Sequence, residues 1–232
     1  MLQLDRLTLT QGTFRLNADW SALPGARIAV MGPSGAGKST LLSAIAGFLA
    51  PTGGRILWDG RDLAPFPAGE RPVTILFQDH NLFPHLTIAQ NLGLGLRPDL
   101  RLTPEDRTRL DQALERVGLG GLGPRRPAQL SGGQASRAAL ARALLRARPI
   151  LMLDEPFAAL GPALRAEMLS LVREVADATA ALVLMVTHDP KDAVALGGQI
   201  AFVADGVAHP PIAAAELLAN PPPAVQGYLG DK

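Results

Sequence analysis

Residues 32–40 read Gly32-Pro33-Ser34-Gly35-Ala36-Gly37-Lys38-Ser39-Thr40, a glycine followed by four free positions and then Gly-Lys-Ser. The apolar run at 27–31 before this stretch suits a buried strand, and the spacing of the apolar residues at 41–46 after it suits a helix. Glycines let a loop turn its backbone N–H groups inward, and the start of the next helix adds the positive end of its dipole. The sequence therefore predicts a phosphate-binding loop between a strand and a helix.

Two side chains in this loop carry specific chemistry. In loops of this pattern the lysine reaches the β- and γ-phosphates of a nucleotide, and the neighbouring hydroxyl ligates Mg²⁺. We therefore predict that residues 32–40 bind ATP through Lys38 and that Ser39 is a Mg²⁺ ligand. The alternative is a glycine-rich turn that binds nothing, and it leaves the flanking strand, the flanking helix and the Lys-Ser pair unexplained.

The bulk properties of the chain exclude several classes of protein. The 232 residues carry a net charge of +1, contain no cysteine and have Lys and Arg dispersed along the chain. Disulfides and thiolate metal sites are therefore excluded, and no nucleic-acid footprint is visible. No apolar run approaches the ~20 residues of a membrane helix, and the N-terminus has no signal-peptide pattern. We expect a protein that is neither secreted nor membrane-spanning and reaches a membrane only through a partner.

The N-terminal region has the pattern of an antiparallel layer. Apolar and polar residues alternate at 2–9 and at 14–20, with a Gln11-Gly12 turn between the two segments. Residues 55–58, followed by Asp59-Gly60, indicate a further strand that ends in a turn. We expect these three strands to lie beside the nucleotide site.

Three apolar runs, at 73–77, 150–153 and 181–186, predict buried parallel strands. In open α/β sheets, ligands bind at the carboxyl ends of such strands. The polar residues expected at those ends are Gln78, Asp154, Glu155 and His188.

We assign roles to these residues from their chemistry. Asp154 is predicted to complete the Mg²⁺ shell together with Ser39 and Gln78, and Gln78 also to lie near ATP. Glu155 is the predicted general base for a water that attacks the γ-phosphate. His188 is predicted to hydrogen-bond the γ-phosphate or orient that water. The alternatives are a solvated acidic turn for Asp154 and Glu155 and a capped surface residue for His188; His80, His85 and His209 are read as structural or exposed.

The middle of the chain has helical patterns. Thr103-Pro-Glu-Asp106 opens a helix that continues to about residue 117, and Ser131-Gly-Gly-Gln134 opens another that runs to about 146. Residues 161–178 form a third helical pattern. We therefore predict one domain over 1–232, in which 1–81 plus 149–232 form the nucleotide-binding α/β core and 82–148 form an inserted helical subdomain.

The run Leu130-Ser131-Gly132-Gly133-Gln134 discriminates best between possible functions. A capping box alone accounts for an ordinary helix start. However, two glycines at a helix N-terminus also make an anion site, and the chain already has a phosphate loop at 32–40. Two phosphate sites for one nucleotide suggest that two chains meet at it.

The motifs at 32–40, Gln78, 130–134, 150–155 and His188 resemble, in this order and spacing, the nucleotide-binding subunits of ABC transporters. The resemblance covers essentially the whole chain. It implies a P-loop NTPase fold of the α/β class, with a mainly parallel RecA-like core sheet, an N-terminal antiparallel β layer and a helical subdomain. It also implies a head-to-tail homodimer, in which each ATP lies between the loop of one chain and Ser131, Gly132, Gly133 and Gln134 of the other.

Four further segments are similar to the ATP-binding subunits of bacterial thiamine importers, namely 46–48, 71–96, 185–188 and 203–206. This similarity implies import of thiamine or its phosphates, delivered by a periplasmic binding protein to membrane permease subunits. The ATPase would then be peripheral, on the cytoplasmic side of the inner membrane. Leu82, Phe83 and Leu86 are candidates for the permease contact, with packing inside the helical lobe as the alternative.

The chain departs from the family pattern at three positions. Gly161 stands where members usually have an aspartate that helps to couple the two sites, and Ala135 replaces a common basic residue. Phe14 occupies the place of the tyrosine that usually stacks on adenine. Phe14 retains a face for stacking without the hydroxyl, and a core role is the alternative.

The sequence is also compatible with three other functions. The chain can serve an importer of another small solute, such as iron or a polyamine. A soluble ATPase of the same superfamily, acting on DNA or ribosomes, would need coiled-coil arms, a second cassette or a basic patch, none of which is visible. A nucleotide-binding module without catalysis is opposed by Glu155 and His188 and favoured by Gly161.

Overall fold

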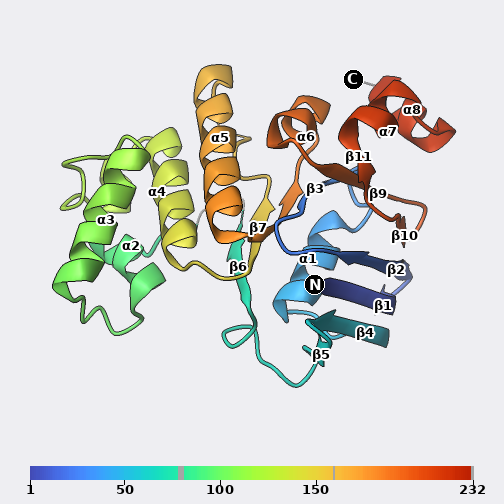
Figure 1. Cartoon of the computed structure of the whole chain (residues 1–232), viewed down its shortest axis with the longest axis horizontal. Helices are drawn as coiled ribbons and strands as arrows, with labels where there is room; N and C mark the ends of the chain where they lie inside the picture. The colour runs from blue at the N-terminus through green and yellow to red at the C-terminus, as the bar shows by residue number, and fades with distance from the viewer. Residues whose placement is uncertain (78–80, 159, 231–232) are drawn as a thin grey trace.

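The computed structural model describes residues 1–77, 81–158 and 160–230. Within these ranges one mixed sheet runs through the molecule in the order β5-β4-β1-β2-β10-β9-β3-β8-β7-β6, with β11 paired to β9. Figure 1 shows the helices α2, α3 and α4 at one end and α7 and α8 at the other. The predicted fold class is confirmed by this arrangement.

The N-terminal strands form the expected antiparallel layer. β1 (Leu2–Gln11) pairs antiparallel with β2 (Phe14–Ala22) and, on its other side, with β4 (Gly53–Trp58). The short β5 (Arg61–Asp62) extends the layer beyond β4. The β1–β2 register runs from Leu2 opposite Ala22 to Gln11 opposite Phe14, so the hairpin turn lies where the sequence predicts it.

The second half of the sheet is parallel and almost wholly apolar, as expected for strands that are covered on both faces. The central pairs are β3–β8 and β3–β9, followed outward by β7 and β6. The strand bounds are Arg27–Met31 for β3, Val73–Leu76 for β6, Ile150–Asp154 for β7, Leu182–Val186 for β8 and Gln199–Ala204 for β9.

Short strands join the two halves of the sheet. β9 turns back through β10 (Val207–Ala208), and β10 pairs in parallel with β2. β11 (Ile212–Ala213) pairs antiparallel with β9. The sequence did not reveal β10 or β11, because two residues carry no hydrophobic periodicity.

Helix α1 (Lys38–Ala46) follows the phosphate loop and is buried against the sheet. The side chain of Arg71, which is almost completely buried, donates to the carbonyl oxygens of Ala44 and Ile45 at the end of this helix. Burial lowers the pKa of Arg71. A cation at a helix C-terminus satisfies carbonyls that have no partner within the helix, so Arg71 fixes α1 and with it the loop at the other end.

The middle of the chain forms α2 (Ile88–Leu96), α3 (Pro104–Arg116), a 3₁₀ turn at Pro127–Gln129 and α4 (Gly132–Leu145). The capping boxes predicted for α3 and α4 are both present. Helix α2 was not foreseen, because its glycines weaken the helical pattern. A Cβ on Gly95 would lie 2.5 Å from the Arg142 carbonyl oxygen, so the glycine lets α2 approach α4 closely.

The remaining helices are α5 (Pro162–Thr179), α6 (Pro190–Leu196), α7 (Ala214–Ala219) and α8 (Pro223–Gly230). Helix α8 begins at Pro223. Proline is tolerated in the first turn of a helix, where its missing N–H has no partner to lose. The Tyr228 ring packs 5.5 Å from that of Phe202 and ties α8 to β9. No helix in the described ranges is long and apolar enough to cross a membrane.

Candidate nucleotide-binding site

The phosphate loop, the β1–β2 hairpin and the strand end after β7 meet around one cavity of about 330 Å³. The residues that line it are Gln11, Phe14, Ser34, Gly35, Gly37, Lys38, Ser39, Thr40 and Glu155. The structure thus brings together three features that the sequence predicts separately. Gln11 was missed, because it follows no motif and reaches the cavity only through its place at the end of β1.

Two positions of the loop favour glycine, because each combines a positive φ with a close neighbour. Gly32 has φ +148°, and a Cβ there would lie 2.0 Å from the Val203 carbonyl oxygen of β9. Gly37 has φ +103°, and a Cβ there would lie 2.5 Å from the Phe14 ring. Phe14 therefore packs directly against the loop, half-buried at the edge of the cavity and in contact with the core.

Positive charge gathers at the mouth of the loop. Lys38 Nζ donates to the carbonyl oxygens of Gly32 and Pro33, each at 2.8 Å, so its ammonium group lies over the loop. The first turn of α1 contains no acidic residue. The start of α1 therefore brings no acidic side chain of its own to the loop, and the positive end of the helix dipole favours an anion at this place.

Asp154 lies at the carboxyl end of β7 and accepts a hydrogen bond from the Ser39 side chain. Partial burial and, less strongly, the charge of Glu155 raise the pKa of Asp154, whereas the Ser39 hydrogen bond and the charge of Lys38 oppose the rise. Two of the three predicted Mg²⁺ ligands are therefore neighbours. The third, Gln78, falls outside the described residues, as does His80.

Glu155 and His188 face each other across the ends of β7 and β8. His188 Nδ1 lies 3.6 Å from Glu155 Oε2. Glu155 has φ +46°, an uncommon conformation for a residue with a side chain, and its N–H donates to the Val186 carbonyl oxygen at 3.1 Å. The backbone hydrogen bond holds Glu155 in this turn beside the phosphate loop, while His85 and His209 are exposed elsewhere.

The Ser131–Gln134 segment begins α4 and does not line the cavity around the phosphate loop. The Ser131 hydroxyl accepts from Gln134 N–H at 3.3 Å, and Gln134 Oε1 accepts from Ser131 N–H at 2.9 Å. Ser131 and Gly132 are exposed. The two predicted anion sites are therefore separate within one chain, and the second faces solvent.

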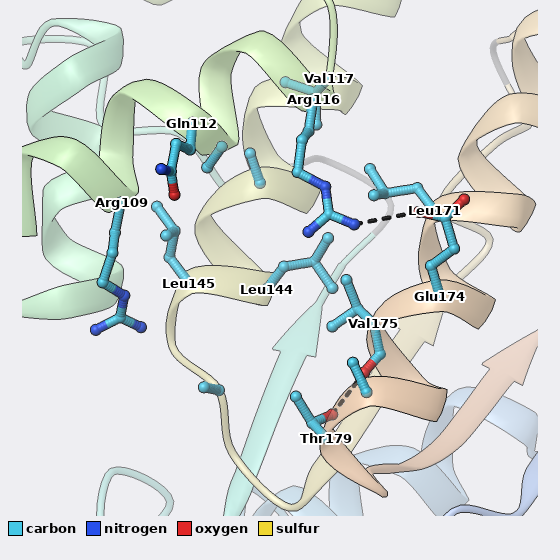
Figure 2. A pocket seen from close by; sticks show the side chains of 14 residues that line it. Arg109, Gln112, Arg116, Val117, Leu144, Leu145, Leu171, Glu174, Val175 and Thr179 are labelled. Carbon is cyan, nitrogen blue, oxygen red and sulfur yellow. Dashed lines mark hydrogen bonds and ion pairs between the residues drawn. The ribbon is translucent and has the colours of Figure 1, made fainter.

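Another groove, of about 270 Å³, lies between α3, α4 and α5 (Figure 2). Leu144 and Val175 contribute to its apolar floor, and an ion pair of 3.1 Å between Arg116 and Glu174 spans it. None of the predicted nucleotide-site residues lines this groove.

Comparison with known proteins decides the family. Residues 16–158 match the family model described as "ABC transporter". The chain belongs to the ABC transporter family. It is 66% identical to the thiamine import ATP-binding protein ThiQ of Cereibacter sphaeroides over 230 residues, which cover 99% of this chain and all of that one. The protein of the same name from a Ruegeria species is 55% identical over the same shares of both chains.

A solved ABC cassette has the same fold. The ATP-binding cassette MJ0796, in a dimeric post-hydrolysis state bound to ADP and Pi, matches with a TM-score of 0.81 and 30% identity. The match covers 92% of this chain and 99% of that one. The protein described here is thus an ABC-type ATPase subunit, and the resemblance stated from its motifs is confirmed.

Proposed function

We propose that this ABC ATPase drives uptake of thiamine or its phosphates, and that two copies of the chain work as a head-to-tail dimer. The observation that carries the proposal is the cavity in which the phosphate loop, Phe14 and Glu155 meet. The substrate is proposed from the relatives, since those at 66%, 55% and 51% identity are all named as thiamine import ATP-binding proteins.

The nucleotide is proposed to occupy the cavity with its phosphates in the loop at 32–40. Backbone N–H groups, the start of α1 and Lys38 supply the positive field that triphosphate oxygens need. Phe14 borders the same cavity and offers an aromatic face to adenine. Its contact with Gly37 fixes the ring beside the loop.

Mg²⁺ fits the donors at the strand end. Ser39 and Asp154, already hydrogen-bonded to each other, would hold the ion together with Gln78. The described residues contain no cluster of three His, Asp or Glu that could hold a metal without help. This fits an ion that binds mainly to substrate phosphates and water, with one or two protein ligands, and that neutralises phosphate charge when bound.

Hydrolysis is assigned to Glu155 and His188. Glu155 borders the loop cavity, where its carboxylate can accept the proton of a water that attacks the γ-phosphate. His188, 3.6 Å from that carboxylate, can orient the water or hydrogen-bond the γ-phosphate. Most of the rate gain is expected from positioning and from charge stabilisation of the transition state.

The second half of each site is proposed to come from the other chain. Ser131, Gly132, Gly133 and Gln134 are placed at an exposed helix start outside the cavity of their own chain. Such a start can receive the γ-phosphate of a nucleotide that is bound by the partner chain. The cassette MJ0796 is dimeric in its post-hydrolysis state, which supports the pairing of two chains.

Contact with the permease is proposed at the segment between β6 and α2. Phe83 is 46% exposed, whereas Leu82 and Leu86 are half-buried, and Leu82 packs against the core of the helical region. Phe83 is thus the best candidate of the three. We place the subunit peripherally on the cytoplasmic side of the inner membrane, with 82–148 acting as a helical subdomain beside the core formed by 1–81 and 149–232.

The proposal is tested with the subunit co-purified with its permease and reconstituted in proteoliposomes. We expect thiamine-loaded periplasmic binding protein to stimulate ATP hydrolysis and to drive thiamine into the vesicles. Lys38→Ala, which removes the phosphate contact, should abolish nucleotide binding and uptake. Stimulation by an iron- or polyamine-loaded binding protein instead would keep the importer and overturn the assignment of its substrate.

A further inference from the structure

We propose that Arg165 and Asp192 are positioning residues for His188, and that they link it to the beginning of α5. The inference rests on the proposed role of His188 in hydrolysis. Neither residue belongs to the motifs from which the site was predicted. Neither lines the cavity at the phosphate loop, but both lie next to Glu155 and His188.

The Asp192 carboxylate is buried and fully engaged. Its side chain is 6% exposed, and it receives two hydrogen bonds from Arg165, Nε to Oδ1 at 2.7 Å and Nη2 to Oδ2 at 2.5 Å. The bidentate geometry is the strongest form of this ion pair, and it raises the pKa of Arg165. Arg165 is in the first turns of α5 and Asp192 is in α6, so the pair fastens two helices together.

The same carboxylate controls the backbone around His188. Thr187 Oγ1 donates to Asp192 Oδ2 at 2.6 Å and accepts from Asp189 N–H at 3.2 Å. One hydroxyl therefore ties the residue before His188 to the N–H of the residue after it. Because Asp192 fixes that hydroxyl, a shift of the ion pair moves the backbone that carries the imidazole.

The beginning of α5, which carries Arg165, also packs on the beginning of α4. A Cβ on Gly133 would lie 3.3 Å from Leu160 and 3.6 Å from Leu164, so the beginning of α5 packs on the segment proposed to bind the partner's nucleotide. Arg165 directly follows Leu164 in the sequence. Contacts thus run from Gly133 through α5 to Asp192, Thr187 and His188.

A small cavity places the pair beside the reacting groups. Arg165 and Asp192 line a space of about 10 Å³ together with Glu155 and His188. This is close to the smallest volume that holds one water molecule. When a partner chain closes on the beginning of α4, a small shift of α5 can therefore change the position of the His188 imidazole.

Asp192→Asn tests the proposal, because it keeps the shape of the side chain and removes its charge. We expect kcat for ATP hydrolysis to fall about 10-fold or more, while KM and the Kd for ATP stay within about twofold. In a His188→Ala background the same substitution should have little further effect, since residues that act through one group are not additive. Asp192→Glu, which can remake the ion pair, should recover part of the activity.

Glu174→Gln is the matched control, because it removes an exposed ion pair from the same helix α5 and should leave kcat unchanged. Equal losses of activity from Asp192→Asn with and without His188 would overturn the positioning role. So would wild-type kcat in Asp192→Asn. Arg165→Lys, which keeps the charge and loses the bidentate contact, replaces Asp192→Asn if that variant does not fold.

A readout that does not depend on turnover separates this inference from the proposed function. The chain has four histidines, so the imidazole NMR signals of His188 can be assigned by substitution. Asp192→Asn should shift them and Glu174→Gln should not. An inactive wild-type protein would count against the ATPase assignment, whereas unmoved His188 signals would count against the ion pair as a positioning device.

Discussion

Glu155 combines a carboxylate near the phosphate loop with a left-handed backbone that the neighbouring strand holds in place. Glu155→Gln keeps the shape of the side chain and removes its ability to take a proton. We expect kcat to fall about 100-fold or more, with ATP affinity preserved. Phosphate release and ATP binding, measured on the same preparation, check this expectation. Turnover at the wild-type rate would show that another group activates the water.

Asp154 gives a prediction about stability and pH. Burial raises its pKa, so the folded protein holds this proton more tightly than the unfolded chain does. The free energy of unfolding therefore falls as the pH rises from the unfolded value near 3.8 through the higher folded pKa. Without Mg²⁺ and nucleotide, Asp154→Asn should melt at a higher temperature than the wild type at neutral pH, by calorimetry.

The same comparison has two internal controls. The difference in melting temperature should shrink on acidification, because the wild-type carboxyl then becomes neutral. Added Mg²⁺ and ATP should stabilise the wild type more than Asp154→Asn, since ligands that bind only the folded state raise its stability. A lower melting temperature for the variant at neutral pH would contradict the balance of burial and charge described for Asp154.

Substitution of Phe14 tests whether its ring stacks on the adenine of ATP. Removing its ring with Phe14→Ala should raise KM for ATP by about 2- to 10-fold, in line with the energy of one aromatic contact. Phe14→Tyr keeps the stacking face and should retain wild-type KM. We would measure the KM for ATP and the KM for GTP of the wild type, Phe14→Ala and Phe14→Tyr. A KM unchanged in Phe14→Ala, with a lower melting temperature, would assign Phe14 to the core alone.

At the residue scale, three residues that the motifs single out, Lys38, Ser39 and Glu155, line the cavity, and Asp154 is hydrogen-bonded to Ser39. The motifs could not reveal Gln11 or Asp192, because these residues join the site through tertiary contacts between segments that are far apart in the sequence. The left-handed backbone of Glu155 was also invisible, since no glycine marks it.

At the scale of elements, Gly161 is the departure with a measurable consequence. It is the N-cap of α5, has β-region dihedral angles and makes no side-chain cap, and a Cβ there would meet no atom within 4 Å. Gly161→Asp should therefore fit and add a cap, raising the free energy of unfolding by a few tenths of a kcal/mol. Gly161→Ala, which cannot cap, should lower it.

The same substitution tests the coupling between sites. In the assembled transporter, Gly161→Asp restores the carboxylate that related subunits usually have, so we expect the Hill coefficient of ATP hydrolysis to change. An unchanged Hill coefficient and rate, together with a raised melting temperature, would make residue 161 a helix cap and nothing more.

Elements with strong local signals were predictable and those without them were not. Capping boxes located the beginnings of α3 and α4, and long apolar runs located the parallel strands. Helix α8 has no such signal, because it directly follows two prolines and begins with a third. Helix α2 was missed because Pro84 and two glycines masked a beginning that Thr87 and Gln90 cap.

At the scale of the whole molecule, the phosphate loop and the start of α4 lie apart in one chain. The cavity at the phosphate loop contains no residue of the Ser131–Gln134 segment. No periodicity or spacing within one chain specifies how two chains pair, so the head-to-tail arrangement came from the family resemblance. In the proposed dimer, the exposed start of α4 in each chain completes the anion site of its partner.

The central claim, a nucleotide site shared by two chains, is tested by the mass of Glu155→Gln in the presence of ATP. Light scattering after size-exclusion chromatography should give twice the 24.3 kDa of one chain with ATP and a single chain without it. Adding Ser131→Arg, which places a bulky cation at the exposed start of α4, should return the ATP-bound protein to a monomer. A dimer that survives Ser131→Arg, or an ATP-bound Glu155→Gln that stays monomeric, would contradict the shared site.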